Sequence, residues 1–328
     1  MLIGSGLSYK TKQFFFVLIK LSIVAGAAYY VYHKLVFNEE LKFPDFVDFL
    51  SKNDNFSTKS VLFLLFLTIF NWFLEIKKWQ YLVSTIKYIS FFEALKQSLA
   101  SLTASLFTPN RIGDYAAKAV YFETKFRAKV LLLNLVSNMA QMCATLIFGC
   151  VGFLILITTY DLDVTYYKVV RIAFYAIVLI FFIGFGVSYK NLSIRGYTLN
   201  DIITFIKSVP RLTHIVNISL SFLRYIVFSF QLFYLLQLFN VQLSYGESMV
   251  IISSMYLLVS IIPTIFVLDI VVKGSVAIFL FDLAGVNNLV VLCVTTLMWL
   301  LNFVLPSVFG SYYILNFNSN STFKTNPS

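Results

Sequence analysis

Long uninterrupted apolar segments are the feature that most limits what this chain can fold into. About 20 apolar residues cross the hydrocarbon core of a bilayer. Six stretches reach that length: residues 13–36, 60–82, 130–159, 169–189, 212–239 and 287–315. Only 12% of the residues are charged, which is about half the share of an average globular domain. The sequence therefore predicts an all-α integral membrane protein with six full spans.

Two further apolar regions are each interrupted near the middle by a proline, Pro109 in the first and Pro263 in the second. Their arms cover residues 91–107 and 111–124 in the first region, and 246–262 and 270–284 in the second. Each arm is too short for a full crossing. A broken helical hairpin that enters and leaves by the same face fits better, provided that protein surrounds the irregular backbone. We therefore expect two re-entrant hairpins.

The basic residues set the expected orientation. If neither hairpin crosses, every basic loop falls on one side, which the positive-inside rule makes the cytoplasmic side. Both termini are then cytoplasmic, and the net charge of +10 reflects these loops rather than a nucleic-acid partner. We expect a multi-pass protein of a bacterial inner membrane. The basic loop residues are Lys10 and Lys12; Lys77, Lys78 and Lys87; Lys125, Arg127 and Lys129; and Lys190, Arg195, Lys207 and Arg211.

The same topology predicts one membrane domain over residues 1–315, made of two equivalent halves, 10–165 and 166–315, followed by a disordered polar tail, 316–328. Each half reads as span, span, broken hairpin, span, so the halves have opposite orientation. Both breaks place an aspartate after the proline and a lysine four residues later: Asp114 and Lys118 in the first, Asp269 and Lys273 in the second. Residues at i and i+4 of a helix share a face and can pair. Inverted repeats with broken helices are typical of secondary transporters.

The first break has the composition of an anion site. Thr108 is a suitable N-cap and Pro109 a suitable first helical residue. The arm that follows would direct free N–H groups and its positive dipole end into the membrane, with Arg111 and Lys118 beside it. Gly113 would permit a close approach of the backbone. The alternative is an ordinary cytoplasmic turn whose arginine follows the positive-inside rule.

Arg224 lies near the middle of the span 212–239. An arginine there costs about 2.5–3.5 kcal/mol on insertion scales, which favours a paired, functional residue. Glu75, Asp114 and Asp269 are the candidate partners. Glu75 lies near a helix end beside two lysines, so a solvated ion pair explains it equally well.

Polar residues in other spans indicate helix contacts rather than chemistry. Asn134, Asn138 and Gln141 form a stripe that suits interhelical hydrogen bonds. Asn302 and Pro306 in the last span predict a kink. No metal-ligand spacing or cofactor motif occurs, and all three cysteines lie inside apolar segments, where we interpret them as packing residues.

The segment from Thr108 to Lys118, Thr-Pro-Asn-Arg-Ile-Gly-Asp-Tyr-Ala-Ala-Lys, resembles the P-G-R-x-G-E…R signature of a flippase-like membrane family. That family is named after the transmembrane region of lysylphosphatidylglycerol synthase. Residues 224–231 and 299–306 look like its later helices, so the resemblance covers about residues 10 to 315. Asn110 stands where the family has Gly, Asp114 stands where it has Glu, and the second, glycine-rich motif is reduced to Pro263, an acid and a basic-Gly-Ser ending.

The resemblance implies lipid handling or flipping in a stand-alone form without the aminoacyl-transfer domain. We expect translocation of an anionic phospholipid or polyprenyl-linked lipid without ATP hydrolysis, because no GxxxxGK[ST] motif is present. The expected substrate-binding residues are Arg111, Asp114, Lys118, Arg224, Asp269 and Lys273, and the expected hinges are Pro109, Gly113 and Pro263. Two alternatives remain: a scaffold or partner subunit of a separate lipid-modifying enzyme, and an intramembrane transferase acting on a lipid-linked substrate.

Overall fold

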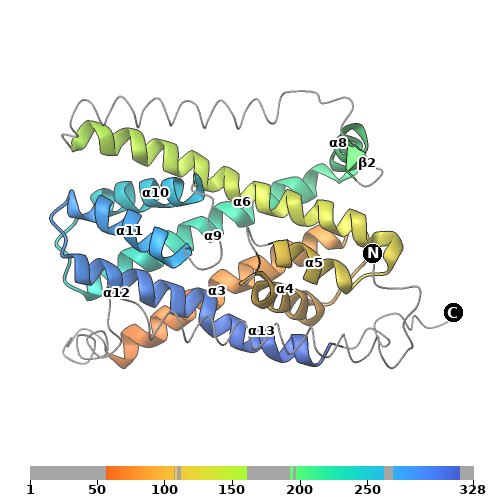
Figure 1. Cartoon of the computed structure of the whole chain (residues 1–328), viewed down its shortest axis with the longest axis horizontal. Helices are drawn as coiled ribbons and strands as arrows, with labels where there is room; N and C mark the ends of the chain where they lie inside the picture. The colour runs from red at the N-terminus through yellow and green to blue at the C-terminus, as the bar shows by residue number, and fades with distance from the viewer. Residues whose placement is uncertain are drawn as a thin grey trace.

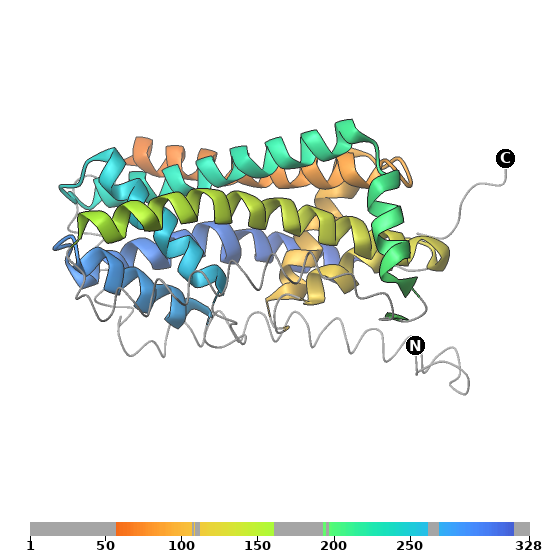
Figure 2. The same ribbon diagram turned by 90° about the horizontal axis from the view of Figure 1, so that it is seen from above.

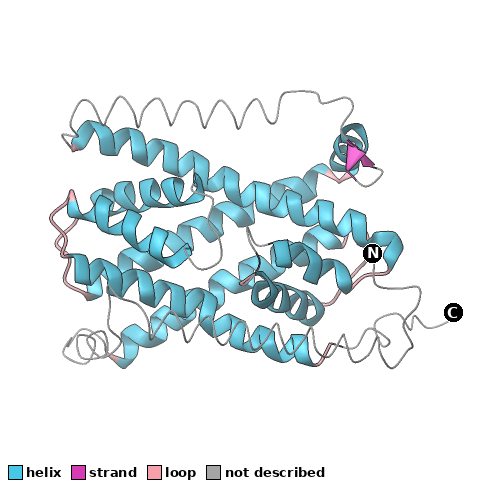
Figure 3. Cartoon of the chain, viewed as in Figure 1, coloured by secondary structure: helices cyan, strands magenta, loops and turns pink. Residues whose placement is uncertain are grey.

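A computed structural model of the chain describes residues 57–106, 108, 112–160, 193–194, 197–261 and 269–317. The helices run mostly along one axis and form an elongated bundle (Figure 1). Apart from a two-residue antiparallel pair, β1–β2, the described elements are helical (Figure 3). In chain order they are α3 (Thr58–Val83), α4 (Phe91–Ser105), α5 (Ile112–Val120), α6 (Thr124–Thr159), β1 (Ser193–Ile194), β2 (Tyr197–Thr198), α8 (Leu199–Ser208), α9 (Arg211–Leu238), α10 (Tyr245–Ile261), α11 (Asp269–Asp282), α12 (Asn288–Trp299), the π-helical segment η2 (Leu300–Val304) and α13 (Leu305–Leu315).

Four helical segments in the described part are long and apolar enough to cross a membrane: α3, α6, α9 and the continuous run from α12 to α13. They correspond to four of the six predicted spans. The predicted spans 13–36 and 169–189, and all but the first two residues of the predicted tail, lie outside the described residues. The helix α6 begins at Thr124, six residues before the predicted start, because helical backbone continues through its basic first turns.

The short arms are present as two helix pairs, α4 with α5 and α10 with α11, and the members of each pair pack against each other. The two pairs lie at opposite ends of the bundle (Figures 1 and 2). Pro109 and Pro263 lie between the arms of their pairs but outside the described residues.

The first arm of each pair starts with the same local device. At α4, the Ser90 hydroxyl accepts from the Glu93 N–H at 3.2 Å, and the Glu93 carboxylate accepts from the Ser90 N–H at 2.7 Å. At α10, Ser244 and Glu247 make the same reciprocal bonds, at 3.3 and 2.9 Å. This capping box satisfies N–H groups that a helix start otherwise leaves free, and it fixes where both arms begin.

Each first arm also packs against a long apolar helix at a glycine, α4 against α13 and α10 against α6. A Cβ on Gly310 of α13 would overlap the carbonyl oxygen of Leu99 in α4. A Cβ on Gly149 of α6 would lie 3.1 Å from the carbonyl oxygen of Ser253 and 2.6 Å from Cβ of Leu257 in α10. Small residues let helix backbones approach closely in membranes, so glycine is required at both contacts.

The predicted kink in the last span is a π-helical segment, η2, just before Pro306. Proline has no N–H and its ring crowds the carbonyl four residues earlier, which here belongs to Asn302. That carbonyl accepts a hydrogen bond from the Trp72 indole of α3 at 3.2 Å. A side chain of a second helix thus satisfies the backbone group that the proline leaves free.

The described residues form four apolar clusters, of which the two largest hold most of the bundle. The larger joins the end of α9 with α10, α11 and α12, around Leu235, Ile251 and Phe281. The smaller joins the ends of α3 and α5 to the start of α6, around Trp79 and Leu133. The helix α8 packs Phe205 and Ile206 onto the smaller cluster. Neither α8 nor β1–β2 was predicted, and both lie in the predicted basic loop that holds Lys190, Arg195, Lys207 and Arg211.

Candidate functional site

Glu75 of α3 is the centre of a buried charged cluster. Its Oε2 lies 2.9 Å from Lys78 Nζ and 2.8 Å from Arg224 Nη1, and its Oε1 lies 3.9 Å from Lys118 Nζ. Glu75 is 8% exposed and Lys78 only 1%. Of the two interpretations of Glu75, the solvated ion pair is therefore wrong. The predicted assignment of Lys78 to a cytoplasmic loop is also wrong, because α3 continues to Val83 and buries it.

A second part of the cluster joins α5 to α6. Lys118 Nζ lies 3.2 Å from Asp114 Oδ1, which confirms the pairing predicted from their i, i+4 spacing. Asn134 holds both residues: its Oδ1 accepts from Lys118 at 2.8 Å and its Nδ2 donates to Asp114 Oδ2 at 2.7 Å. The Lys118 ammonium also lies 4.6 Å from the centre of the Trp79 ring, a cation–π contact that favours a desolvated cation.

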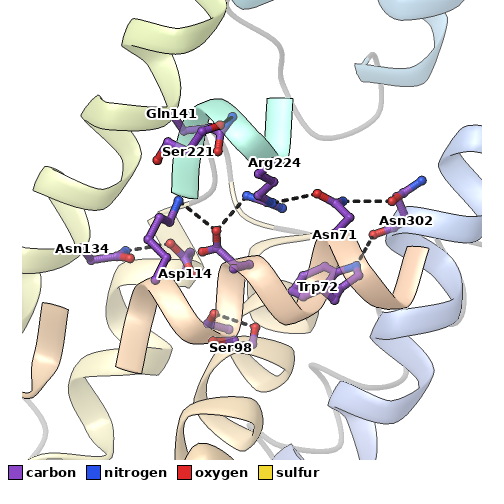
Figure 4. A network of polar contacts seen from close by, with 12 residues as sticks. Asn71, Trp72, Ser98, Asp114, Asn134, Gln141, Ser221, Arg224 and Asn302 are labelled. Atoms are coloured by element: carbon purple, nitrogen blue, oxygen red, sulfur yellow. Dashed lines mark hydrogen bonds and ion pairs between the residues drawn. The ribbon is translucent and has the colours of Figure 1, made fainter. Parts of the chain in front are cut away.

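A chain of side-chain amides leads from the cluster to the last span (Figure 4). Arg224 Nε donates to Asn71 Oδ1 at 3.1 Å, and Asn71 Nδ2 donates to Asn302 Oδ1 at 3.1 Å. Asn302 Nδ2 in turn donates to Gln231 Oε1 at 3.0 Å. Because an arginine can only donate, its contact with Asn71 sets the orientation of each following amide. Arg224 is therefore fixed from two sides, by Glu75 and by this amide chain.

The cluster carries unequal charge. Among the described residues it contains three cations, Lys78, Lys118 and Arg224, and two carboxylates, Glu75 and Asp114, which leaves an excess of one positive charge. The side chains of both lysines are at most 2% exposed, whereas that of Arg224 is 23% exposed. Its Nη2 makes no hydrogen bond to the described part of the protein. The excess charge is thus accessible at Arg224.

Gly113 lies where α5 packs closely against α4, and its role as a hinge stays a prediction. A Cβ at this position would overlap the carbonyl oxygen of Ala104 in the facing arm. The Gly113 N–H donates to the Thr108 hydroxyl at 2.7 Å, so Thr108 caps the start of α5 as predicted, although from five residues away. This turn fixes the start of the helix that carries Asp114 and Lys118.

Of the predicted site residues, the structure brings together Asp114, Lys118 and Arg224, around Glu75. Lys273 lies on α11 in the other hairpin, with its ammonium 5.1 Å from the centre of the Phe303 ring. Arg111 and the side chain of Asp269 lie outside the described residues. The polar stripe on α6 makes the predicted interhelical hydrogen bonds: Asn134 as above, Asn138 to the Tyr115 hydroxyl at 3.0 Å and Gln141 to the Ser221 carbonyl at 3.4 Å.

Sequence reasoning missed Lys78, Asn71 and Gln231. Asn71 lies four residues before Glu75, and Gln231 seven after Arg224, so each shares a helix face with a residue already selected. That periodicity was the available signal for both. Lys78 follows an apolar run, as cytoplasmic lysines do, and no local pattern marks it as buried.

Among the residues that the structure describes, no group of three or more His, Cys, Asp or Glu side chains could hold a metal ion. Comparisons with curated proteins and with solved structures give no significant match. Residues 17–310 match the family described as the lysylphosphatidylglycerol synthase TM region. This match covers both helix pairs and the charged cluster, and it identifies an integral membrane protein of a lipid-related family. The chain belongs to the lysylphosphatidylglycerol synthase TM region family.

Proposed function

We propose that this protein translocates an anionic lipid, with a phospholipid or polyprenyl-linked phosphate headgroup, across a bacterial inner membrane without hydrolysing ATP. The observation that carries the proposal is the excess positive charge of the buried cluster, accessible at Arg224. Burying more cations than carboxylates in a membrane protein is costly. A transient anionic ligand offsets that cost, and a lipid phosphate is the anion that a bilayer supplies.

In this proposal Arg224 contacts the phosphate through its free Nη2, and Lys118 supplies a second charge from α5. Arg111, Asp269 and Lys273 act as further substrate-binding residues. The breaks at Pro109 and Pro263 act as hinges. The guanidinium suits this role because it presents several donors in one plane and can hold Glu75, Asn71 and a phosphate together.

The alternating exposure of such a site would come from two inverted halves with re-entrant hairpins and cytoplasmic termini. Three features of the bundle support this part of the proposal. Both hairpins begin with a capping box. Each first arm packs against a glycine of the opposite last span. The central helices α3 and α9 pack against each other, where the axis relating two halves would pass. Rocking of one half against the other would expose the cluster to each leaflet in turn.

The test is leaflet-resolved lipid movement in proteoliposomes, with anionic and zwitterionic reporter lipids. We expect the wild-type protein to move the anionic reporter faster than protein-free vesicles do, and Arg224→Gln to abolish this movement. The variant should fold, because it leaves two lysines opposite two carboxylates. Arg211→Gln is the matched control, since Arg211 is exposed at the start of the same helix. A folded wild-type protein that moves neither reporter would contradict the proposal.

A further inference from the structure

A line of polar side chains follows the contact between α6 and α9 and continues to α10. At one end of this line, Asn217 Nδ2 donates to the Val136 carbonyl at 3.2 Å, which holds α9 against α6. At the other end, the rings of Tyr225 and Tyr256 lie edge to face with centroids 6.0 Å apart. We name this line the polar seam. Its members are Ser137 and Gln141 of α6; Asn217, Ser221, Tyr225 and Ser229 of α9; and Tyr256 of α10.

Every member of the polar seam has a buried side-chain oxygen without a hydrogen-bond partner in the described part of the protein. The Tyr225 and Ser229 hydroxyls lie close to each other, but without an aligned hydrogen bond. Buried polar atoms are almost always satisfied by protein or by ordered water. Seven unsatisfied oxygens along one line of a membrane protein therefore indicate internal waters, each with several polar partners available.

The polar seam leads away from the charged cluster. Ser137 lies one helical turn after Asn134, which binds Asp114 and Lys118. On α9 the members recur every fourth residue from Asn217 to Ser229, a rise of about 18 Å at 1.5 Å per residue. The polar seam thus reaches from the first hairpin to the last turns of α10 in the second.

The polar seam is closely packed. Ser137 and Ser221 are completely buried, and the ring of Phe148 stacks on that of Tyr225 with 4.7 Å between centroids. Such packing suits single waters better than a lipid headgroup. Carboxylates within membrane proteins mark proton relays.

Asp114 is a carboxylate that connects to this line through Asn134, one helical turn before Ser137 on α6. It faces Lys118 on its own helix, Asn134 of α6 and Ser101 of α4. Beyond Lys118, the cluster adds Glu75 and Lys78 of α3 and Arg224 of α9. Protonation of Asp114 would change the balance from three cations against two carboxylates to three against one. The affinity of the cluster for an anion would rise, and by reciprocity a bound anion would raise the affinity of Asp114 for a proton.

We propose that the polar seam holds a file of internal waters that carries protons to Asp114, and that the protein moves an anionic lipid together with a proton. The inference rests on the proposed function and adds its energy source. The proton binds the Asp114 carboxylate as the lipid phosphate replaces that carboxylate as the counterion of Lys118. Both leave on the other side, so one proton and one monoanionic lipid move no net charge.

The experiment separates exchange from net movement in proteoliposomes that contain an anionic reporter lipid and an internal pH dye. Exchange at equal pH on both sides needs only the lipid site. Net movement driven by a pH gradient needs the proton as well. For the wild type we expect the reporter to accumulate in the leaflet on the alkaline side, with proton entry reported by the dye. A potassium diffusion potential should not drive net movement.

Two sets of variants test the assignment. The triple variant Ser137→Ala, Ser221→Ala and Tyr225→Phe should keep exchange at equal pH and lose at least about 10-fold of the gradient-driven movement, about 1.4 kcal/mol as a rate ratio. Asp114→Asn should make whatever exchange it retains independent of pH, and should lose gradient-driven movement. Thr295→Val is the matched control, because its hydroxyl bonds within its own helix, to Val291 O at 2.9 Å.

The outcomes separate proton coupling from lipid translocation. If the wild-type protein exchanges lipid without any response to the pH gradient, proton coupling is overturned and translocation stands. If the folded wild-type protein exchanges no lipid, the proposed function itself is contradicted. A higher melting temperature for Ser221→Ala than for the wild type would indicate a dry, unsatisfied hydroxyl, and would also overturn the proposal.

Discussion

At the scale of single residues, the charge balance around Glu75 decides which substitutions the cluster tolerates. Glu75→Gln would leave three cations with one carboxylate, whereas Lys78→Met would leave two of each sign. Removing one partner of a buried ion pair costs about 3–5 kcal/mol when the other charge is left uncompensated. We therefore expect Glu75→Gln to lower the melting temperature in detergent far more than Lys78→Met does, as followed by tryptophan fluorescence. Equal losses would show that the cluster does not act as one electrostatic unit.

Local spacing predicted which residues pair on the same helix, whereas the pairs between helices depend on how the helices pack. The ion pair of Asp114 with Lys118 follows from their i, i+4 spacing. The partner of Arg224 could be narrowed to three acids, because a mid-span arginine needs one, but only the packing of α3 against α9 selects Glu75. The burial of Lys78 could not be predicted, since it depends on α4 and α6, which are distant in sequence from Lys78 or separated from it by a turn, packing against α3.

At the scale of elements, glycine contacts control how closely helices of the two halves approach. Gly310→Ala would place a methyl group against the backbone of α4 at Leu99, so α13 must move away. Forcing extra volume into such a contact costs about 1–3 kcal/mol. Gly274→Ala is the matched control: it has the same helix-propensity gain, and its new Cβ meets only a Leu292 methyl at 3.5 Å. Thermal unfolding should show a loss for Gly310→Ala alone, and equal stability of the two variants would contradict this account of the contact.

The first and last residues of the helices could be predicted where a proline or a capping residue marks a helix end. Prolines and capping residues are local signals, so three of the four hairpin arms begin and end within two residues of the prediction. The remaining arm, α5, ends at Val120 instead of 124. The π-helical segment could not be predicted as such. Its partner comes from a helix far away in sequence: the Trp72 indole N–H donates to the carbonyl of Asn302 that the proline leaves free.

At the scale of the whole molecule, two inverted halves require hairpins that open toward opposite faces of the membrane. The turn between α3 and α4 and the turn between α9 and α10 lie at opposite ends of the bundle (Figures 1 and 2). Both turns lead into a capping box, which supports the proposal that they are equivalent positions. In the proposed orientation the first turn faces the cytoplasm and the second the outside.

Cysteine labelling in intact bacteria tests this orientation. After replacement of Cys143, Cys150 and Cys293, single cysteines are placed at the exposed positions Ser84 and Gln242. We expect Gln242→Cys to react with a membrane-impermeant maleimide in cells whose outer membrane has been opened. Ser84→Cys should react only after the inner membrane is permeabilised. In the proposed repeat the two residues follow equivalent helices, α3 and α9, so labelling of both from one side would contradict inverted halves. Alternating access by rocking of inverted halves would then have no structural basis, whatever lipid the charged cluster binds.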